Sequence, residues 1–115
     1  MIYKGGCHCG RIAFDVEGDL HSVMECNCSI CAQRGYLLWM IPRAQLRLQV
    51  PERNLTTYTF NTHKIKHRFC SKCGSGLFGE GVDKTGSSTA AINVRCLEGV
   101  EVSKLKVTPF DGRSL

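Results

Sequence analysis

The sequence predicts a small, mostly β domain of antiparallel sheets that is held together by zinc. Three observations predict this class: short apolar–polar alternations between turn residues, weak helical periodicity, and eight cysteines in 115 residues. A chain of this length forms one domain with a modest core. We therefore expect a single zinc-binding domain over residues 1–115, in which metal cross-links add stability.

The alternating segments are expected to be strands. Residues 11–17 alternate between apolar and polar, and the continuous apolar run at residues 36–41 before Pro42 fits a buried strand. Further strands are expected at residues 21–25, 46–50, 55–60, 65–69, 89–94 and 100–107. Single helical turns are expected at residues 29–33 and 43–46, and the glycine-rich segment 74–86 predicts turns.

The abundance of cysteine indicates metal binding. The N-terminal residues lack the apolar stretch of a secretory signal, so we expect a cytoplasmic protein. Clustered cysteines in a reducing compartment more often bind metal than form disulfides. Disulfides are the alternative, but Cys7 and Cys9, like Cys26 and Cys28, lie too close in the chain to bridge comfortably.

The net charge gives little support for a polyanionic partner. The formal charge of +5 counts the cysteines as neutral, whereas metal-bound cysteines are thiolates. Seven thiolates and two zinc ions would lower the charge to about +2. The basic residues are also dispersed, which counts against nucleic acid. No apolar run approaches the ~20 residues that cross a bilayer, so no membrane partner is expected.

The first candidate metal site combines Cys7 and Cys9 with Cys70 and Cys73. The Cys-x-x-Cys spacing lets a tight turn direct two sulfurs at one ion, and glycines next to both pairs permit such turns. Two pairs complete the closed four-sulfur set of structural zinc and would join an N-terminal strand to the middle of the chain. The alternative is a redox pair of Cys70 and Cys73, but its βαβ context is absent.

The second candidate metal site is the compact trio Cys26, Cys28 and Cys31. Three local ligands can hold one zinc and leave its fourth position open for a water, a thiolate or a carbonyl oxygen. Alternatively, Cys96 closes this site, or Cys96 is simply a buried apolar residue. Iron–sulfur ligation is a further alternative, although the spacing differs from that of ferredoxins.

Four stretches place these cysteines in motifs: Gly6-Cys-His-Cys-Gly10, Cys26-Asn-Cys-Ser-Ile-Cys31, Arg68-Phe-Cys-Ser-Lys-Cys-Gly74 and Asn93-Val-Arg-Cys-Leu97. In this order they resemble the glutathione-dependent formaldehyde-activating enzyme family, which shares a domain with centromere protein V. The resemblance covers nearly the whole chain.

The resemblance implies a zinc-bearing β fold, often called a β-tent, with two zinc ions per chain. It implies that the four distant cysteines are the structural-zinc ligands and that Cys26, Cys28 and Cys31 are the catalytic-zinc ligands. The implied reaction makes or breaks a carbon–sulfur bond between glutathione and formaldehyde, giving S-hydroxymethylglutathione. The implied partner is therefore a small-molecule thiol or aldehyde.

Other residues are candidates for substrate contact or proton transfer. Glutathione carries two carboxylates, so Arg34, which follows the metal loop, is the first choice for a cationic contact. Lys66 and Arg68 are weaker choices that more often are solvated surface charges. His67 fits a hydrogen-bonded core histidine better than a proton shuttle. Glu25 fits a surface residue better than a general base.

Two functional classes remain open at this stage. The first is a zinc-dependent carbon–sulfur lyase that acts on an aldehyde adduct of glutathione or another small thiol. The second is a non-catalytic zinc module that binds a protein or nucleic acid. The trio with its open coordination position favours the enzyme.

Overall fold

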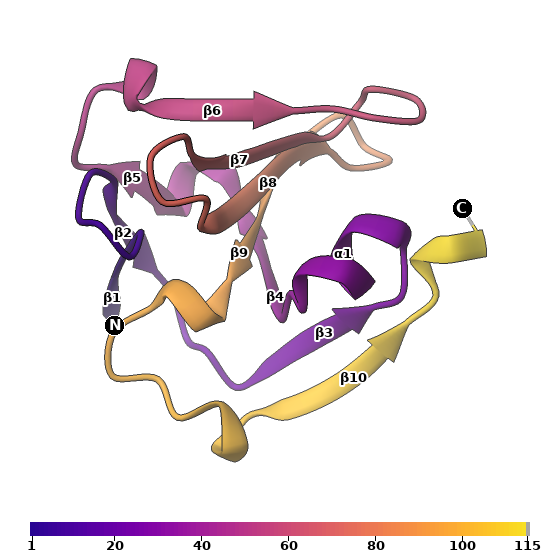
Figure 1. Cartoon of the computed structure of the whole chain (residues 1–115). Helices are drawn as coiled ribbons and strands as arrows, with labels where there is room; N and C mark the ends of the chain where they lie inside the picture. Colours follow the sequence, from indigo (N-terminus) through magenta and orange to yellow (C-terminus); the bar gives the residue numbers. More distant parts are fainter. Residues whose placement is uncertain (115) are drawn as a thin grey trace.

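The computed structural model, which describes residues 1–114, is mostly β and contains two sheets (Figure 1). The smaller sheet has the strand order β1-β2-β5, and the larger one has the order β10-β3-β4-β9-β8-β7-β6. The strands are β1 Ile2–Gly6, β2 Ala13–Glu17, β3 Ser22–Cys26, β4 Leu38–Pro42, β5 Leu46–Leu48, β6 Leu55–Tyr58, β7 Lys66–Cys70, β8 Gly76–Val82, β9 Ser88–Asn93 and β10 Lys106–Phe110. The helix α1 is Ser29–Arg34, and short 3₁₀ turns are Arg43–Gln45, Glu52–Asn54, Val94–Cys96, Val102–Lys104 and Gly112–Ser114.

The core lies between the two sheets and follows the predicted alternation. In β2, Phe14 and Val16 are buried, while Asp15 between them is partly exposed. The Phe14 ring meets Phe78 of β8 edge-on with a centroid separation of 5.7 Å. Burial of each such side chain contributes about 2 kcal/mol. Within residues 1–114, no helix is long and apolar enough to cross a membrane.

The prediction of purely antiparallel sheets is wrong at one strand pair. β10 pairs with β3 in parallel, with Phe110 opposite Cys26, and the two arrows run side by side in the same direction in Figure 1. The connection from β9 to β10 is long, and β4 and β3 lie between these two strands in the sheet. A strand's own sequence pattern does not specify the direction of its neighbour, so the sequence could not reveal this pairing.

Two segments differ from the sequence-based expectation. The segment 74–86 was expected to form turns, but β8 occupies most of it as an interior strand between β7 and β9. Among its glycines, Gly76 is required by close packing, since an added Cβ there would overlap the Tyr36 ring, whereas one at Gly79 or Gly81 would meet Ile65 at an ordinary 3.5 to 3.7 Å. The expected strand at 100–107 begins only at Lys106, because the residues before it form a 3₁₀ turn.

A β-bulge changes which side chains of β7 are buried. The β7–β8 register shifts between Arg68 and Phe69, so neighbouring residues no longer alternate strictly. His67 and Arg68 are both buried, whereas Ile65 is half exposed and lies before the strand. Ile65, His67 and Phe69 therefore do not share one buried face, as strict alternation along a strand at 65–69 would place them. The expectation that Arg68 is a surface charge is wrong.

Candidate metal centres

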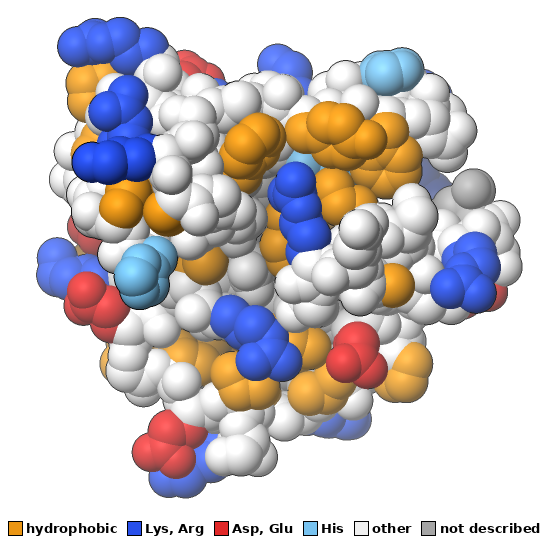
Figure 2. Space-filling view, in the orientation of Figure 1, with side chains coloured by type: hydrophobic (Ala, Val, Ile, Leu, Met, Phe, Trp, Pro, Cys, Tyr) orange, Lys and Arg blue, Asp and Glu red, His pale blue; other side chains and the backbone are white. Residues whose placement is uncertain are grey.

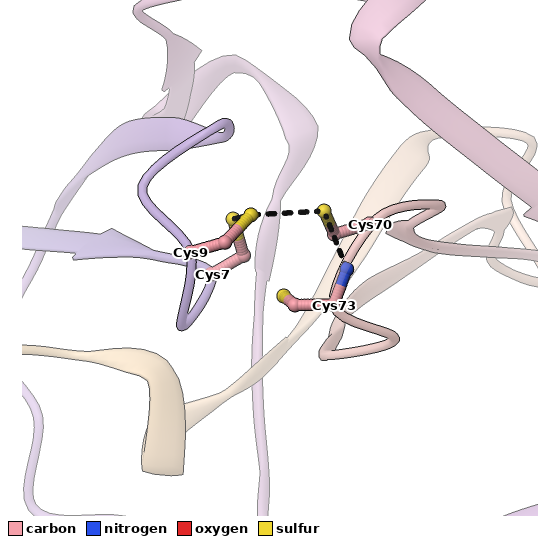
Figure 3. A group of neighbouring side chains, drawn as sticks. All are labelled: Cys7, Cys9, Cys70 and Cys73. Carbon is pink, nitrogen blue, oxygen red and sulfur yellow. Dashed lines mark hydrogen bonds between the residues drawn. The ribbon is translucent and has the colours of Figure 1, made fainter.

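The four predicted cysteines of the first site come together between the β1–β2 and β7–β8 loops. Cys7 and Cys9 follow β1, Cys70 ends β7, and Cys73 lies in the turn to β8. All four Sγ atoms lie within 4.8 Å of one another. The sulfurs of Cys9 and Cys70 are 3.6 Å apart, and Figure 3 shows the four side chains converging from the two loops. The group could hold one metal ion.

Backbone and hydroxyl donors point at these sulfurs. The backbone N–H of Ile12 donates to Cys7 Sγ at 3.2 Å, and that of Cys73 donates to Cys70 Sγ at 3.5 Å. Gly74 closes the turn at φ 82°, a conformation that glycine adopts readily. The side chain and backbone of Ser75 lower the pKa of Cys73 to about 5. These donors stabilise thiolates, which are the forms that bind metal.

The same distances exclude the disulfide alternative in the described chain. Cys7 and Cys9 have sulfurs 3.6 Å apart, far beyond the ~2.05 Å of a covalent S–S bond. All eight cysteines are free. Cys70 and Cys73 share their surroundings with two further thiols, as in a four-ligand group and unlike an isolated redox pair.

The predicted trio forms a second group at the junction of β3 and α1. Cys26 ends β3, Cys28 caps α1, and Cys31 lies within that helix. Their Sγ atoms also lie within 4.8 Å of one another. Burial and the two neighbouring thiols raise the pKa of Cys31. Burial opposes ionisation of Cys28, but hydrogen bonds from the Cys31 backbone and thiol give a net lowering of its pKa. Such closely spaced thiols ionise together only when a cation compensates their charge.

A pocket of about 530 Å³ opens beside the trio. Cys26 and Cys31 form part of its wall, together with Tyr36 and two carboxylate residues, Glu25 and Asp111. The remaining lining residues are Asn27, Ala32, Gly35, Pro109 and Phe110. Within residues 1–114, no fourth His, Cys, Asp or Glu joins the trio. An ion held by three sulfurs would thus have a pocket from which a small molecule could approach.

Cys96 joins neither cysteine group. Its thiol donates to the carbonyl oxygen of Gly76 at 3.3 Å, and Asn93 donates to its sulfur at 3.7 Å. Burial, followed by the charges of Cys7 and Cys73, raises the pKa of Cys96 to about 11. It is a half-buried thiol near the four-cysteine group and does not close the trio.

Arg34 lies on the other face of α1 from the pocket beside the trio. It lines a separate hollow of about 330 Å³ with Ser29, Ile30, Gln33, Tyr58 and Phe60. Figure 2 shows this face of the molecule, where hydrophobic and cationic side chains meet around a hollow. The Arg34 guanidinium donates to the Tyr36 hydroxyl at 2.8 Å and lies 5.4 Å from the centre of the Phe69 ring. Arg34 therefore reaches the trio pocket only through Tyr36.

The other predicted polar candidates fall into different surroundings. Arg68 is buried and pairs with Glu80 at 2.7 Å, whereas Lys66 is exposed. His67 is buried against the ring of Phe60, with centroids 5.3 Å apart. Burial and the nearby charge of Arg34 lower the pKa of His67. Its burial fits the expected core histidine, but the expected hydrogen bond of its ring is absent within residues 1–114.

Three residues at the trio were not singled out from the sequence. The Arg95 guanidinium donates to the carbonyl oxygen of Gly35, a lining residue of the trio pocket, at 3.1 Å. The Asn27 side-chain oxygen accepts a hydrogen bond from the backbone N–H of Arg113, and the neighbouring Gly112 packs against the sulfur of Cys26. Arg95 and Asn27 lie inside the cysteine motifs and could have been considered there, whereas Gly112 carries no sequence signal.

A mostly β fold that brings together one group of four cysteines and one of three defines a class of small proteins built around cysteine-rich metal centres. A family model described as glutathione-dependent formaldehyde-activating enzyme matches residues 2–109. The chain belongs to this family, as the motifs predicted.

One solved structure supports the same relationship. It is a crystal structure of a Rhodobacter sphaeroides protein that is 32% identical and has a TM-score of 0.77. The match covers 91% of the present chain and 99% of that one. The fold is thus shared over nearly the full length of both.

Proposed function

We propose that the protein is a zinc-dependent carbon–sulfur lyase that acts on the adduct of a small thiol, such as glutathione, with an aldehyde such as formaldehyde. The observation that carries this proposal is the trio of sulfurs within 4.8 Å of one another beside a pocket of about 530 Å³. Membership of the family supports the same chemistry.

The spacing of the sulfurs in the first group fits a tetrahedral ion such as zinc. Four sulfurs at about 2.3 Å from a tetrahedral ion lie about 3.8 Å from one another. The nearest sulfurs of the first group are 3.6 Å apart. We propose that Cys7, Cys9, Cys70 and Cys73 hold a structural zinc and that Cys26, Cys28 and Cys31 hold a second zinc.

The reaction needs no oxidant. The thiol sulfur adds to the carbonyl carbon of formaldehyde. The carbon–sulfur bond forms as the S–H bond and the π bond of the carbonyl break, and the thiol proton ends on the new hydroxyl oxygen. Zinc at the trio would supply a Lewis acid that lowers the pKa of a bound thiol or polarises a carbonyl. Cys26, Cys28 and Cys31 would hold it beside the pocket, whose lining includes the rings of Tyr36 and Phe110.

Recognition of glutathione requires a cation for its carboxylates. The Arg95 guanidinium donates to the carbonyl oxygen of Gly35, which lines the trio pocket, and we propose Arg95 as a direct carboxylate contact. Arg34, the contact predicted from the sequence, faces the other hollow and holds the Tyr36 hydroxyl. We propose that Arg34 acts through Tyr36 as a positioning residue.

Exchange spectroscopy tests the activity directly. With the two-zinc protein, proton NMR is expected to show faster exchange of the methylene group between hydrated formaldehyde and S-hydroxymethylglutathione. The variant C28A should lose this acceleration, whereas C96A should keep it because Cys96 belongs to neither cysteine group. Equal rates with and without the protein, for glutathione and other small thiols, would leave the non-catalytic zinc module as the better account.

A further inference from the structure

We infer that residues 110–114, here called the covering segment, are fastened by Asn27 over the trio and position Cys26 for metal binding. The inference rests on the proposed function, because it requires a metal at the trio. It assigns a role to a part of the chain that contributes no ligand.

Gly112 brings the covering segment against the sulfur of Cys26. A Cβ atom added at Gly112 would fall well inside van der Waals contact with Cys26 Sγ and 3.3 Å from the Cβ of Cys28. The backbone at this position therefore packs directly on the trio, and only glycine fits without a shift. One side of the group is thereby closed to solvent, and the pocket beside Cys31 remains as an approach.

Asn27 fastens the segment from within the metal motif. Its side-chain amide donates to Asp111 Oδ1 at 2.9 Å, and its side-chain oxygen accepts from the backbone N–H of Arg113 at 2.8 Å. Its own backbone N–H donates to the carbonyl oxygen of Phe110 at 3.1 Å. One residue between two cysteines thus makes three hydrogen bonds to the covering segment.

The parallel pairing of β10 with β3 sets the register of this contact. Phe110 lies opposite Cys26, so the chain continues past the end of β3 in the direction of the trio. Phe110 and Asp111 also line the trio pocket. The covering segment therefore both closes one side of the sulfur group and shapes the opening on another.

Release of metal to a chelator tests the inference on the two-zinc protein. Loss of outer contacts around metal ligands typically weakens metal affinity 10- to 100-fold. We expect N27D, which places a carboxylate against Asp111, to release one of the two zinc ions roughly tenfold faster and the other at the wild-type rate. The double variant N27D/D111N restores a donor–acceptor pair and should return the fast phase toward the wild-type rate.

Gly112→Ala and Gly81→Ala provide a matched second pair. G112A introduces a methyl group against Cys26 and should also accelerate the release of one zinc ion. G81A should leave zinc release unchanged, because the added atom meets Ile65 at an ordinary 3.7 Å. Cobalt substitution gives an independent readout, since the thiolate-to-metal absorption bands of the trio should shift in N27D and G112A but not in G81A.

The outcomes separate the two proposals. Two metals per wild-type chain with unchanged release and unchanged cobalt bands in folded N27D and G112A would overturn the covering role and leave the proposed function standing. A single metal per wild-type chain, with free thiols at the trio, would overturn both.

Discussion

Cys9 and Cys70 are 61 residues apart in the chain, yet their sulfur atoms lie 3.6 Å apart. This contact joins the loop after β1 in the small sheet to the end of β7 in the large sheet. Closing a loop of this length costs conformational entropy, which a shared metal ion would offset. The four-cysteine group is therefore placed where it can tie the two sheets together.

The two cysteine groups should differ in their effect on stability. We expect C73A to unfold the domain or make it insoluble, because structural zinc contributes on the order of 10 kcal/mol, comparable to the total stability of a domain. C28A should lose one zinc and retain its fold. Zinc content by atomic absorption and thermal unfolding by circular dichroism measure both effects.

Cys96 supplies the control for this comparison. C96A should retain two zinc ions, because Cys96 joins neither cysteine group. The loss of stability should be limited to the contacts of the removed sulfhydryl group and its hydrogen bonds with Gly76 and Asn93. Equal stability and equal zinc content in C73A and C28A would contradict the proposed division between a structural and a second metal.

The two arginines near Tyr36 should affect substrate binding in different ways. R95A is expected to raise KM for glutathione about tenfold, as expected for one lost charged contact of about 1.4 kcal/mol. R34A should have a smaller effect through the Tyr36 hydroxyl. If Arg34 acts through Tyr36, the effect of R34A should largely disappear when it is combined with Y36F.

Additive effects of R34A and Y36F would contradict the indirect role. A large rise of KM in R34A together with an unchanged KM in R95A would instead place the substrate in the hollow lined by Ser29 and Phe60. Steady-state kinetics with glutathione, and with a thiol that lacks carboxylates, measures both outcomes.

Sequence spacing was sufficient to predict the two cysteine groups. Ligand spacing is a local property of the chain, and the turns that hold Cys70 and Cys73 carry the glycine that such turns need. The alternating strands were also predictable, because apolar residues at every second position, such as Phe14 and Val16 of β2, occupy the buried face.

Features that depend on distant partners could not be predicted. The burial of Arg68 follows from a bulge in β7 and from Glu80 on the neighbouring strand. β8 is a strand despite its glycines because two neighbours pair with it. The covering of Cys26 by Gly112 requires the parallel β3–β10 pairing, which no local pattern encodes.

The ion-pair group around Glu80 should be important for stability. Its carboxylate accepts from Arg43 at 2.6 Å and from the buried Arg68 at 2.7 Å. E80A would leave the buried positive charge of Arg68 without its closest carboxylate partner. We expect the free energy of unfolding to fall by about 3 kcal/mol. E52A is the matched control, because Glu52 is 70% exposed and 3.4 Å from Arg68, so its removal should cost less than about 1 kcal/mol.

Urea unfolding of the zinc-loaded variants measures this difference. A loss in E80A no larger than that in E52A would show that water replaces the Glu80 carboxylate around Arg68 without penalty. An E80Q variant, which keeps the size and one acceptor oxygen, should fall between E80A and the wild type.

His67 should make the folded state less stable in acid. Burial and the charge of Arg34 lower its pKa in the folded protein, so the folded state binds fewer protons at this residue than the unfolded chain, whose histidine pKa is about 6.5. The free energy of unfolding is therefore unaffected by this titration above the unfolded pKa of about 6.5. It decreases as the pH falls from about 6.5 toward the lower folded pKa, because the unfolded chain takes up the proton first. H67F removes the titration and keeps an aromatic ring against Phe60. We expect the thermal midpoints of wild type and H67F to diverge between pH 7.5 and roughly 5.5, with the midpoint of the wild type falling further.

Because metal-bound thiolates are the same in both proteins, acid loss of zinc affects both alike and does not contribute to the difference. Parallel curves would mean that His67 is protonated as readily in the folded protein as in the unfolded chain.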